Sequence, residues 1–175
     1  MKTMMIAAMA AALSAAPAAA RLESSGADGF VSVNEALVPL PADRLWAAVT
    51  SWSSWWDPAH SYSGRPGAII LEPQAGGALV ERWPGGSTTH ATVLTVMPPG
   101  LLRLSDGFGP LQSLPVGAIL DIALKPEAGG TRLKMTYRTG GSPAQKLDAL
   151  AGPVDFVMSA GFSGLVNFAT TGKPK

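Results

Sequence analysis

Short runs of alternating hydrophobic and polar residues fill the middle of the chain. The first run, FVSVNEALVPL, places Val31, Val33 and Leu37 on one parity, which predicts a strand. A series of predicted hairpins follows, because glycine pairs at residues 76–77 and 85–86 supply the positive φ angles of tight turns. The pattern predicts about seven antiparallel strands in all. The last six lie in the segments AIILEPQAGGALVERWPGGSTTHATVLTVM, LLRLS and VGAILDIALKPEAGGTRLKMTYR.

Three segments change to a helical period. PADRLWAAV, residues 41–49, predicts a short helix that begins at a proline, and residues 52–57 predict a second short helix or turn. Near the C-terminus, Ser142-Pro143-Ala144-Gln145 has the N-cap serine and following glutamine that start a helix. The long amphipathic helix predicted there is expected to kink or split at Gly152-Pro153. Its apolar stripe consists of Leu147, Leu150, Val154, Met158, Gly161 and Leu165.

The predicted order of elements is one strand, two short helices, six antiparallel strands and one long C-terminal helix. The fold class is therefore α+β, in a single domain over residues 29–170. One amphipathic helix has to cover the apolar face of a strongly curved sheet. We expect this arrangement to leave a pocket between the helix and the sheet.

The first twenty residues are typical of a secretory signal peptide. MKTMMIAAMAAALSAAPAAA has one basic residue near its start, an apolar run, and small residues before a cleavage site near Ala20. The run is too short and too rich in alanine for stable membrane insertion. We therefore expect a protein exported to the periplasm or secreted, with a flexible lead-in at residues 21–28 and a flexible tail at residues 171–175.

Charge and composition exclude several classes of partner. Beyond residue 20 the chain has 12 acidic residues and 12 Lys and Arg residues, so the processed chain has no net formal charge. Such a balance gives no reason to expect binding to nucleic acid or to an anionic membrane. The chain has no cysteine, which excludes disulfides and thiolate chemistry. With 47% hydrophobic residues, the core is expected to stabilise the fold alone.

Three phrases of the sequence, in this order, are similar to one known family. LPADRLWAAVTSWSSWWDP, AGGALVERWPGG and GGTRLKMTYR resemble segments of domains related to the activator of Hsp90 ATPase. These domains belong to the START/polyketide cyclase-like (SRPBCC) superfamily, and the resemblance covers residues 30–170. It implies the helix-grip fold, in which a curved sheet wraps around a long C-terminal helix. It also implies a cavity that holds an apolar or amphipathic small molecule, although some members are enzymes such as cyclases and hydrolases.

The chaperone setting of the named family does not suit this chain. The predicted export signal would take the protein away from Hsp90 and ATP, and the chain has no GxxxxGK[ST] phosphate loop. Metal binding is not expected either, because two histidines, His60 and His90, and no cysteine fall short of a zinc ligand set. A serine nucleophile is disfavoured because GxSxG is absent. We expect no cofactor.

Acid–base chemistry is the strongest enzymatic hypothesis. Glu81 shares a face with Leu79 in its predicted strand and is the better candidate for a carboxylate aimed into the cavity. There it would have a raised pKa or pair with a cation such as Arg103. By parity, Asp121 is expected to be exposed. His90, on the next strand, has the parity of Thr92, Leu94 and Val96. The pair Glu81 and His90 is therefore a candidate acid–base pair, the alternative being an ordinary cross-strand pair on the surface.

Aromatic residues supply the expected walls of the cavity. Trp55 and Trp56 are adjacent and cannot point the same way, so one should be buried while the other lines the cavity. The candidate ligand-binding residues are Trp55, Trp56, Tyr62, Trp83, Phe108, Phe156 and Phe162.

These features predict non-catalytic binding of a small apolar or amphipathic molecule. One alternative is a cyclase- or hydrolase-like enzyme that uses Glu81 and His90 in the same cavity. A second alternative is a protein-interaction domain with the Trp-rich turn as an exposed apolar patch. A carbohydrate site on the tryptophans has less support, because they share one short turn and do not form a flat row.

Overall fold

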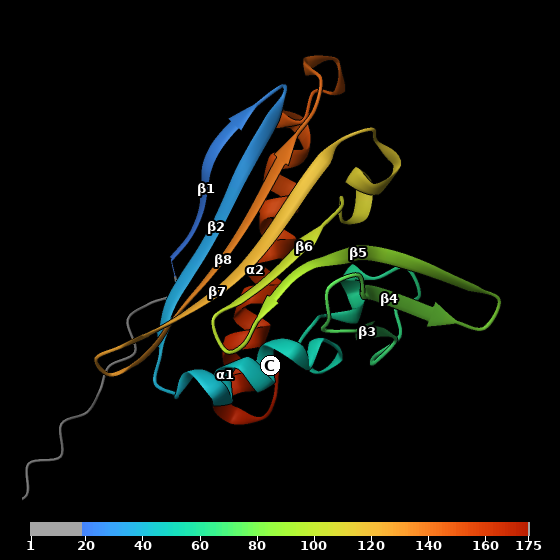
Figure 1. Ribbon diagram of the computed structural model, residues 1–175. Helices are drawn as coiled ribbons and strands as arrows, with labels where there is room; N and C mark the ends of the chain where they lie inside the picture. Colours follow the sequence, from blue (N-terminus) through green and yellow to red (C-terminus); the bar gives the residue numbers. More distant parts are fainter. Residues whose placement is uncertain (1–18, 175) are drawn as a thin grey trace, which may run out of the picture.

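Eight β-strands form one antiparallel sheet in the computed structural model, which describes residues 19–174 (Figure 1). The order across the sheet is β1-β2-β8-β7-β6-β5-β4-β3. The strands are β1 (Ala19–Gly26), β2 (Gly29–Val38), β3 (Ile69–Leu71), β4 (Ala78–Trp83), β5 (Gly86–Met97), β6 (Leu101–Ser105), β7 (Gly117–Glu127) and β8 (Gly130–Gly140). The helices are α1 (Ala42–Thr50) and α2 (Asp148–Thr171), with short 3₁₀ turns η1 (Trp52–Ser54), η2 (Pro58–His60), η3 (Gly109–Ser113) and η4 (Pro143–Gln145).

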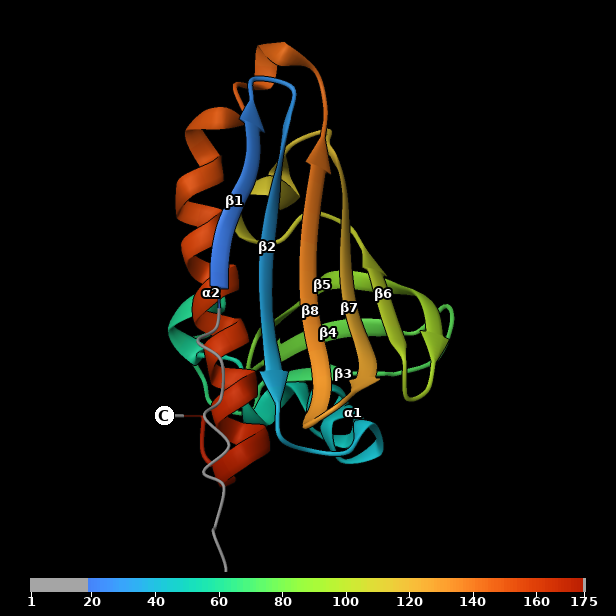
Figure 2. The same ribbon diagram turned by 90° about the vertical axis from the view of Figure 1, so that its left-hand side faces the viewer.

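The sheet is strongly curved, and β5 is where much of the bend arises. In Figure 2, β3, β4 and β5 run across the direction of β1, β2, β7 and β8. The pairing of β5 shifts register twice, against β4 between Leu79 and Val80 and against β6 between Val93 and Thr95. Such bulges bend a strand and increase its twist. The curled sheet thereby surrounds one side of α2.

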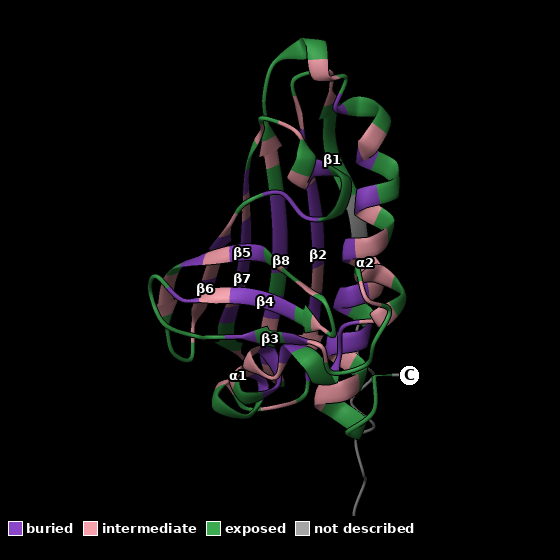
Figure 3. Cartoon of the chain, turned by 90° about the vertical axis from the view of Figure 1, so that its right-hand side faces the viewer, coloured by how far each residue is buried: buried purple, intermediate pink, exposed green. Residues whose placement is uncertain are grey.

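Helix α2 packs its apolar stripe against the concave face of the sheet. Figure 3 shows its buried positions turned towards the sheet and its exposed positions on the far side. By length and composition alone α2 would pass as a membrane span, as the core helix of a soluble protein also can. Its buried residues are Ala151, Val154, Met158, Gly161, Phe162, Gly164 and Leu165.

The N-terminal part of the domain differs from the prediction. Residues 21–28 were expected to be a flexible lead-in, but β1 occupies positions 19–26 and pairs with β2 as an edge strand. An edge strand needs little apolar character because its outer side is solvated, so RLESSG gave no strand pattern. The sheet thus has eight strands instead of about seven, and the domain starts before residue 29. The predicted signal peptide lies largely in residues 1–18, outside the described part of the chain.

The start of the C-terminal helix also differs from the prediction. Ser142 does form a capping box with Gln145, but the box caps the 3₁₀ turn η4. Lys146 then adopts a left-handed conformation with φ of 50°, and α2 begins at Asp148. Pro153 does not split α2, which runs continuously to Thr171. The helix therefore also includes the first residue of the expected tail.

Candidate functional site

A cavity of about 540 Å³ lies between the curled part of the sheet and α2. Its walls come from η1, η2, β3, β4, β5, the η3 loop and one face of α2. Helix α2 contributes Pro153, Val154, Val157 and Met158. Tyr62 lines the cavity and is 55% exposed, so the cavity opens to solvent beside this ring.

The Trp-rich turn divides its tryptophans between the core and the cavity. Trp55 is 1% exposed, and its indole N–H donates to the Val49 carbonyl at 3.3 Å. Trp56 lines the cavity, and its indole N–H donates to the His60 carbonyl at 3.1 Å. The 3₁₀ turn η1 also buries Trp52, which lines the cavity too. With all three rings buried, this turn offers no exposed apolar patch to a protein or sugar partner.

Near-parallel aromatic rings form one wall of the cavity. Phe108 is inclined by 12° to Trp52 and by 18° to His90, with ring centroids 6.4 Å apart in each case. The Phe108 backbone N–H donates to the Tyr137 hydroxyl at 2.9 Å, which ties the η3 loop to β8. Burial raises the pKa of that tyrosine. The Trp52 indole N–H is buried and has no hydrogen-bond partner within residues 19–174.

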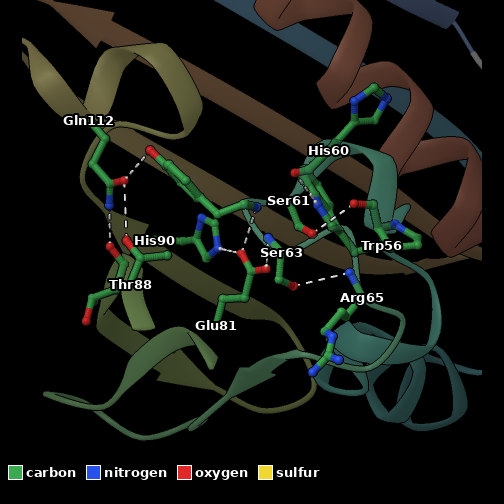
Figure 4. Close-up of polar contacts among 12 residues, drawn as sticks. Trp56, His60, Ser61, Ser63, Arg65, Glu81, Thr88, His90 and Gln112 are labelled. Carbon is green, nitrogen blue, oxygen red and sulfur yellow. Dashed lines mark hydrogen bonds and ion pairs between the residues drawn. The ribbon is translucent and has the colours of Figure 1, made fainter. Parts of the chain in front are cut away.

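Glu81 is completely buried beside the cavity and accepts three hydrogen bonds. Its Oε2 accepts from the Tyr62 backbone N–H at 3.0 Å and from His90 Nε2 at 2.9 Å, while Oε1 accepts from the Ser63 backbone N–H at 2.7 Å. Figure 4 shows Glu81 between His90 and Ser63. The carboxylate therefore fixes the loop that follows η2 to the strand β4.

The same contacts lower the pKa of the Glu81 carboxyl group. Burial alone would raise its pKa, but hydrogen bonds from Ser63, from the Tyr62 backbone and from His90 outweigh burial and lower the pKa from 4.5 to about 2. The expected pairing of Glu81 with a cation such as Arg103 is wrong, and so is the raised pKa expected for an unpaired carboxylate. Glu81 is an ionised carboxylate in a largely apolar setting.

His90 lies at a bulge of β5, two residues after Thr88 and on the same side of the strand. Opposite β4, Glu81 pairs with Thr88 and Val80 with Thr89, but Leu79 pairs with Ala91. The extra residue is His90, whose side chain is 4% exposed and lines the cavity. The prediction that the two residues meet is confirmed by the 2.9 Å contact, and the pair is buried instead of lying on the surface. The parity argument behind it is wrong, since the bulge breaks the alternation.

The mouth of the cavity is bridged by a hydrogen bond between two loops. The Tyr62 hydroxyl donates to Oε1 of Gln112 at 2.8 Å, and Gln112 Nε2 donates to the Thr89 carbonyl. The Tyr62 ring also lies 5.7 Å from the His90 ring. Tyr62 thus stands between solvent and His90.

The seven predicted ligand-binding residues separate into three groups. Trp56, Tyr62 and Phe108 line the cavity. Trp55 and Phe162 do not line it, and both are packed into the hydrophobic core.

The remaining two residues, Trp83 and Phe156, lie outside the cavity. Trp83 is at the end of β4, where its ring lies against Gly86 of the hairpin turn. Phe156 is 68% exposed on the outer side of α2, and its ring meets His60 edge-on. Helical position explains this placement, since Phe156 is two residues from Val154 and therefore on another face.

Several cavity residues were not predicted, although some carried a usable signal. The α2 residues 153, 154, 157 and 158 share one face by helical spacing, which could have been recognised once the helix was assigned. Trp52 lines the cavity from the Trp-rich turn, although it is not among the predicted ligand-binding residues. His60, Ile69 and Leu79 also line the cavity, and no simple sequence pattern joins them.

Asp121 was expected to be exposed, and this is wrong. The residue does point away from the core, but Arg103 and Arg138 cover it and leave it 8% exposed. Arg103 Nε lies 2.6 Å from one carboxylate oxygen and Arg138 lies 3.0 Å from the other. Burial raises the pKa of Asp121, but the hydrogen bonds and positive charges of the two guanidinium groups hold it below its usual value. This is a structural ion-pair cluster outside the cavity.

The site offers acid–base and hydrogen-bonding groups. Among residues 19–174, no group of three or more His, Asp or Glu side chains could hold a metal ion. The described residues that line the cavity include no Lys, Arg, Asp or Glu. Its polar side chains include His60, Ser61, Tyr62, His90 and Ser113.

Several solved structures are similar to this chain in fold. No protein-family model and no curated protein matches the chain. A Rhodobacter sphaeroides crystal structure has a TM-score of 0.60 and 21% identity, covering 87% of this chain and 98% of that chain. The Aha1 dimer from Colwellia psychrerythraea has a TM-score of 0.58 and 14% identity, covering 82% and 98%. The di-domain ARO/CYC StfQ from the steffimycin biosynthetic pathway has a TM-score of 0.56 and 15% identity, covering 82% and 50%.

These likenesses agree with the topology. The eight-stranded curved antiparallel sheet around one long C-terminal helix is the arrangement implied by the resemblance to domains related to the activator of Hsp90 ATPase. The chain therefore has the helix-grip fold that these solved structures share.

Proposed function

We propose that this protein binds a small apolar or amphipathic molecule in the cavity between the sheet and α2, without transforming it. The observation that carries this proposal is a cavity of about 540 Å³ with mainly apolar and aromatic walls. Small-molecule sites generally have this form, with a few polar groups that orient the ligand. His90, held by Glu81, would be such a group here.

The fold supports the same proposal. One of the structural neighbours is described as an ARO/CYC of a biosynthetic pathway, so related folds serve small-molecule chemistry. At 15% identity that likeness concerns the fold, and the ligand of this chain has to be inferred from its own residues.

A second candidate function is acid–base catalysis in the same cavity. A buried carboxylate that holds a histidine beside an apolar cavity is an arrangement that can position a general base. This candidate predicts that Glu81 and His90 are needed for turnover of a bound molecule but not for its binding. The first candidate predicts that the bound molecule is released unchanged.

The binding proposal can be tested with a cavity-filling variant. N-phenyl-1-naphthylamine, an apolar fluorescent probe, should bind the wild-type protein and gain fluorescence. Val157→Trp places a large ring into the cavity and should abolish this signal. Phe156→Trp is the matched control, because the neighbouring side chain is exposed and does not line the cavity. Equal probe binding by both variants would overturn the proposed site.

Native mass spectrometry adds a second test. Protein purified from its own host should retain a small molecule of constant mass that Val157→Trp lacks. If that molecule is recovered with a changed mass after incubation with fresh protein, catalysis replaces simple binding as the proposed function.

We also propose that the protein is exported, on the strength of the N-terminal sequence. Cleavage near Ala20 would leave most of β1, from position 21 onwards, in the sheet. N-terminal sequencing of the protein from a periplasmic fraction tests this, and recovery of an uncleaved chain only in the cytoplasm would overturn it.

A further inference from the structure

The hydrogen bonds of Glu81 determine which nitrogen of His90 carries a proton towards it. An ionised carboxylate only accepts hydrogen bonds, so the 2.9 Å contact requires a proton on His90 Nε2. The low pKa of Glu81 supports this assignment. In the neutral ring the proton is then on Nε2, and Nδ1 keeps its lone pair.

The second ring nitrogen of His90 is available to a bound molecule. Nδ1 makes no hydrogen bond within residues 19–174. It is not one of the fully buried polar atoms without a partner in this range, so part of its surface is accessible. The ring itself lines the cavity. Nδ1 is therefore a hydrogen-bond acceptor that opens into the cavity.

The surroundings of His90 narrow the chemistry of the ligand further. The Phe108 ring is nearly parallel to the His90 ring and the Tyr62 ring lies 5.7 Å away, so the cavity wall beside His90 is aromatic and favours a flat aromatic group packed against it. Because the wall of the described cavity carries no acidic or basic side chain other than histidine, a neutral ligand is favoured over an ion.

We infer that the ligand is a neutral aromatic molecule whose hydroxyl group donates a hydrogen bond to Nδ1 of His90. This rests on the proposed binding function and adds the substrate class to it. Glu81 is the positioning residue, since it fixes the tautomer that turns an acceptor towards the cavity. The unpartnered indole N–H of Trp52, also on a cavity-lining residue, would suit an oxygen acceptor on the same ligand.

The test compares two probes that differ only in this donor, 2-naphthol and its methyl ether, 2-methoxynaphthalene. Titration calorimetry at about pH 8, above the ordinary pKa of imidazole, gives the affinity of each probe. The preference for the naphthol should be about tenfold greater in the wild-type protein than in His90→Phe. Comparing the two proteins cancels the different hydrophobicity of the probes.

Phe156→Trp is the control, because Phe156 is exposed on the outer side of α2 and does not line the cavity. It should leave the wild-type preference unchanged. An equal preference in wild type and His90→Phe would overturn the inference. If neither naphthalene compound nor N-phenyl-1-naphthylamine binds, the proposed function itself has failed.

A measurement on the wild-type protein keeps the inference testable if His90→Phe does not fold. The chain has two histidines, so their ring nitrogens can be resolved by nitrogen NMR. The spectrum should show a protonated Nε2 on His90. Addition of 2-naphthol should shift its Nδ1 resonance, whereas the methyl ether should not. A protonated Nδ1 on a neutral ring would overturn the assignment.

Discussion

Glu81 and His90 are 2.9 Å apart although they are not opposite each other in the β4–β5 ladder, where Glu81 pairs with Thr88. His90 is two residues after Thr88 and lies on the same side of β5, so its ring reaches the carboxylate diagonally. The carboxylate also holds the backbone of the following loop through Tyr62 and Ser63. One buried residue therefore organises a strand, a loop and the polar end of the cavity.

Glu81→Gln should destabilise the protein at neutral pH. The folded-state pKa of about 2 lies below the ordinary 4.5, so the ionised carboxylate stabilises the fold above about pH 4.5. The loss should be about 3 kcal/mol at neutral pH and should shrink as the pH falls from 4.5 towards 2. Urea unfolding of both proteins across this range measures it. Glu72→Gln, at an exposed position, is the control, and a pH-independent difference for Glu81→Gln would contradict the prediction.

Two glycines of α2 should resist substitution by alanine to different degrees. A Cβ on Gly164 would lie 2.5 Å from the Trp55 carbonyl oxygen, and one on Gly161 would lie 2.7 Å from the Trp56 ring. Backbone yields less than a side chain, so Gly164→Ala should cost at least about 2 kcal/mol and Gly161→Ala about 1 kcal/mol.

Gly152→Ala is the control for this series, because no atom lies within 4 Å of the position that its Cβ would occupy. The helix preference of alanine is opposed there by the following Pro153, so the change should stay within about 0.5 kcal/mol. Thermal unfolding ranks the three variants. Equal costs for Gly164→Ala and Gly152→Ala would show that α2 does not approach the Trp-rich turn so closely.

Tyr62→Phe should speed the exchange of a bound probe. The variant keeps the ring but loses the hydrogen bond to Gln112 that bridges the cavity mouth. Loss of about 1 kcal/mol corresponds to roughly fivefold faster dissociation of N-phenyl-1-naphthylamine in stopped-flow fluorescence. The free energy of unfolding should change little, since both groups are on exposed loops. Unchanged dissociation would show that the bond does not restrict the mouth.

Asp121→Asn should weaken the outer face of the sheet without affecting the cavity. It removes the ion pairs to Arg103 and Arg138, both of which are substantially exposed. The expected cost is therefore only about 1 kcal/mol, and it should decrease in high salt. Probe affinity should remain at the wild-type value. A large loss of probe binding would mean that this cluster influences the site through the sheet.

The periodic parts of the sequence predicted most of the fold. The hairpin glycines and the long apolar stripe of α2 identified the sheet and its helix, because burial on one face imposes a regular period. β1 escaped recognition since a solvated edge strand needs no such pattern. The buried polar residues Ser32 and Asn34 also stand on the face of β2 that carries Phe30 and Ala36 into the core, where an apolar side would be expected.

The candidate site could be predicted only in part. Neighbouring strands predict that Glu81 and His90 meet. The bulge that separates His90 from the parity of the residues after it has no signature in the alternation. The aromatic character of Phe156 and Trp83 does not predict their placement, which depends on the rotation of α2 and on the end of the β4–β5 hairpin. The remaining lining residues lie on loops. The positions of these loops depend on local hydrogen bonds, such as those that Glu81 accepts from Tyr62 and Ser63, and the sequence pattern does not predict them.

The bulge at His90 has a consequence for how this protein could change. Up to the bulge, Thr88 and His90 share the inward side of β5, and His90 lines the cavity; after it, Ala91 and Val93 are buried. The strand thus contains two separate frames of inward positions, one for the cavity and one for the core. Substitutions in the first frame can alter what the protein recognises while the second continues to hold the sheet together, so ligand preference can diverge without loss of the scaffold.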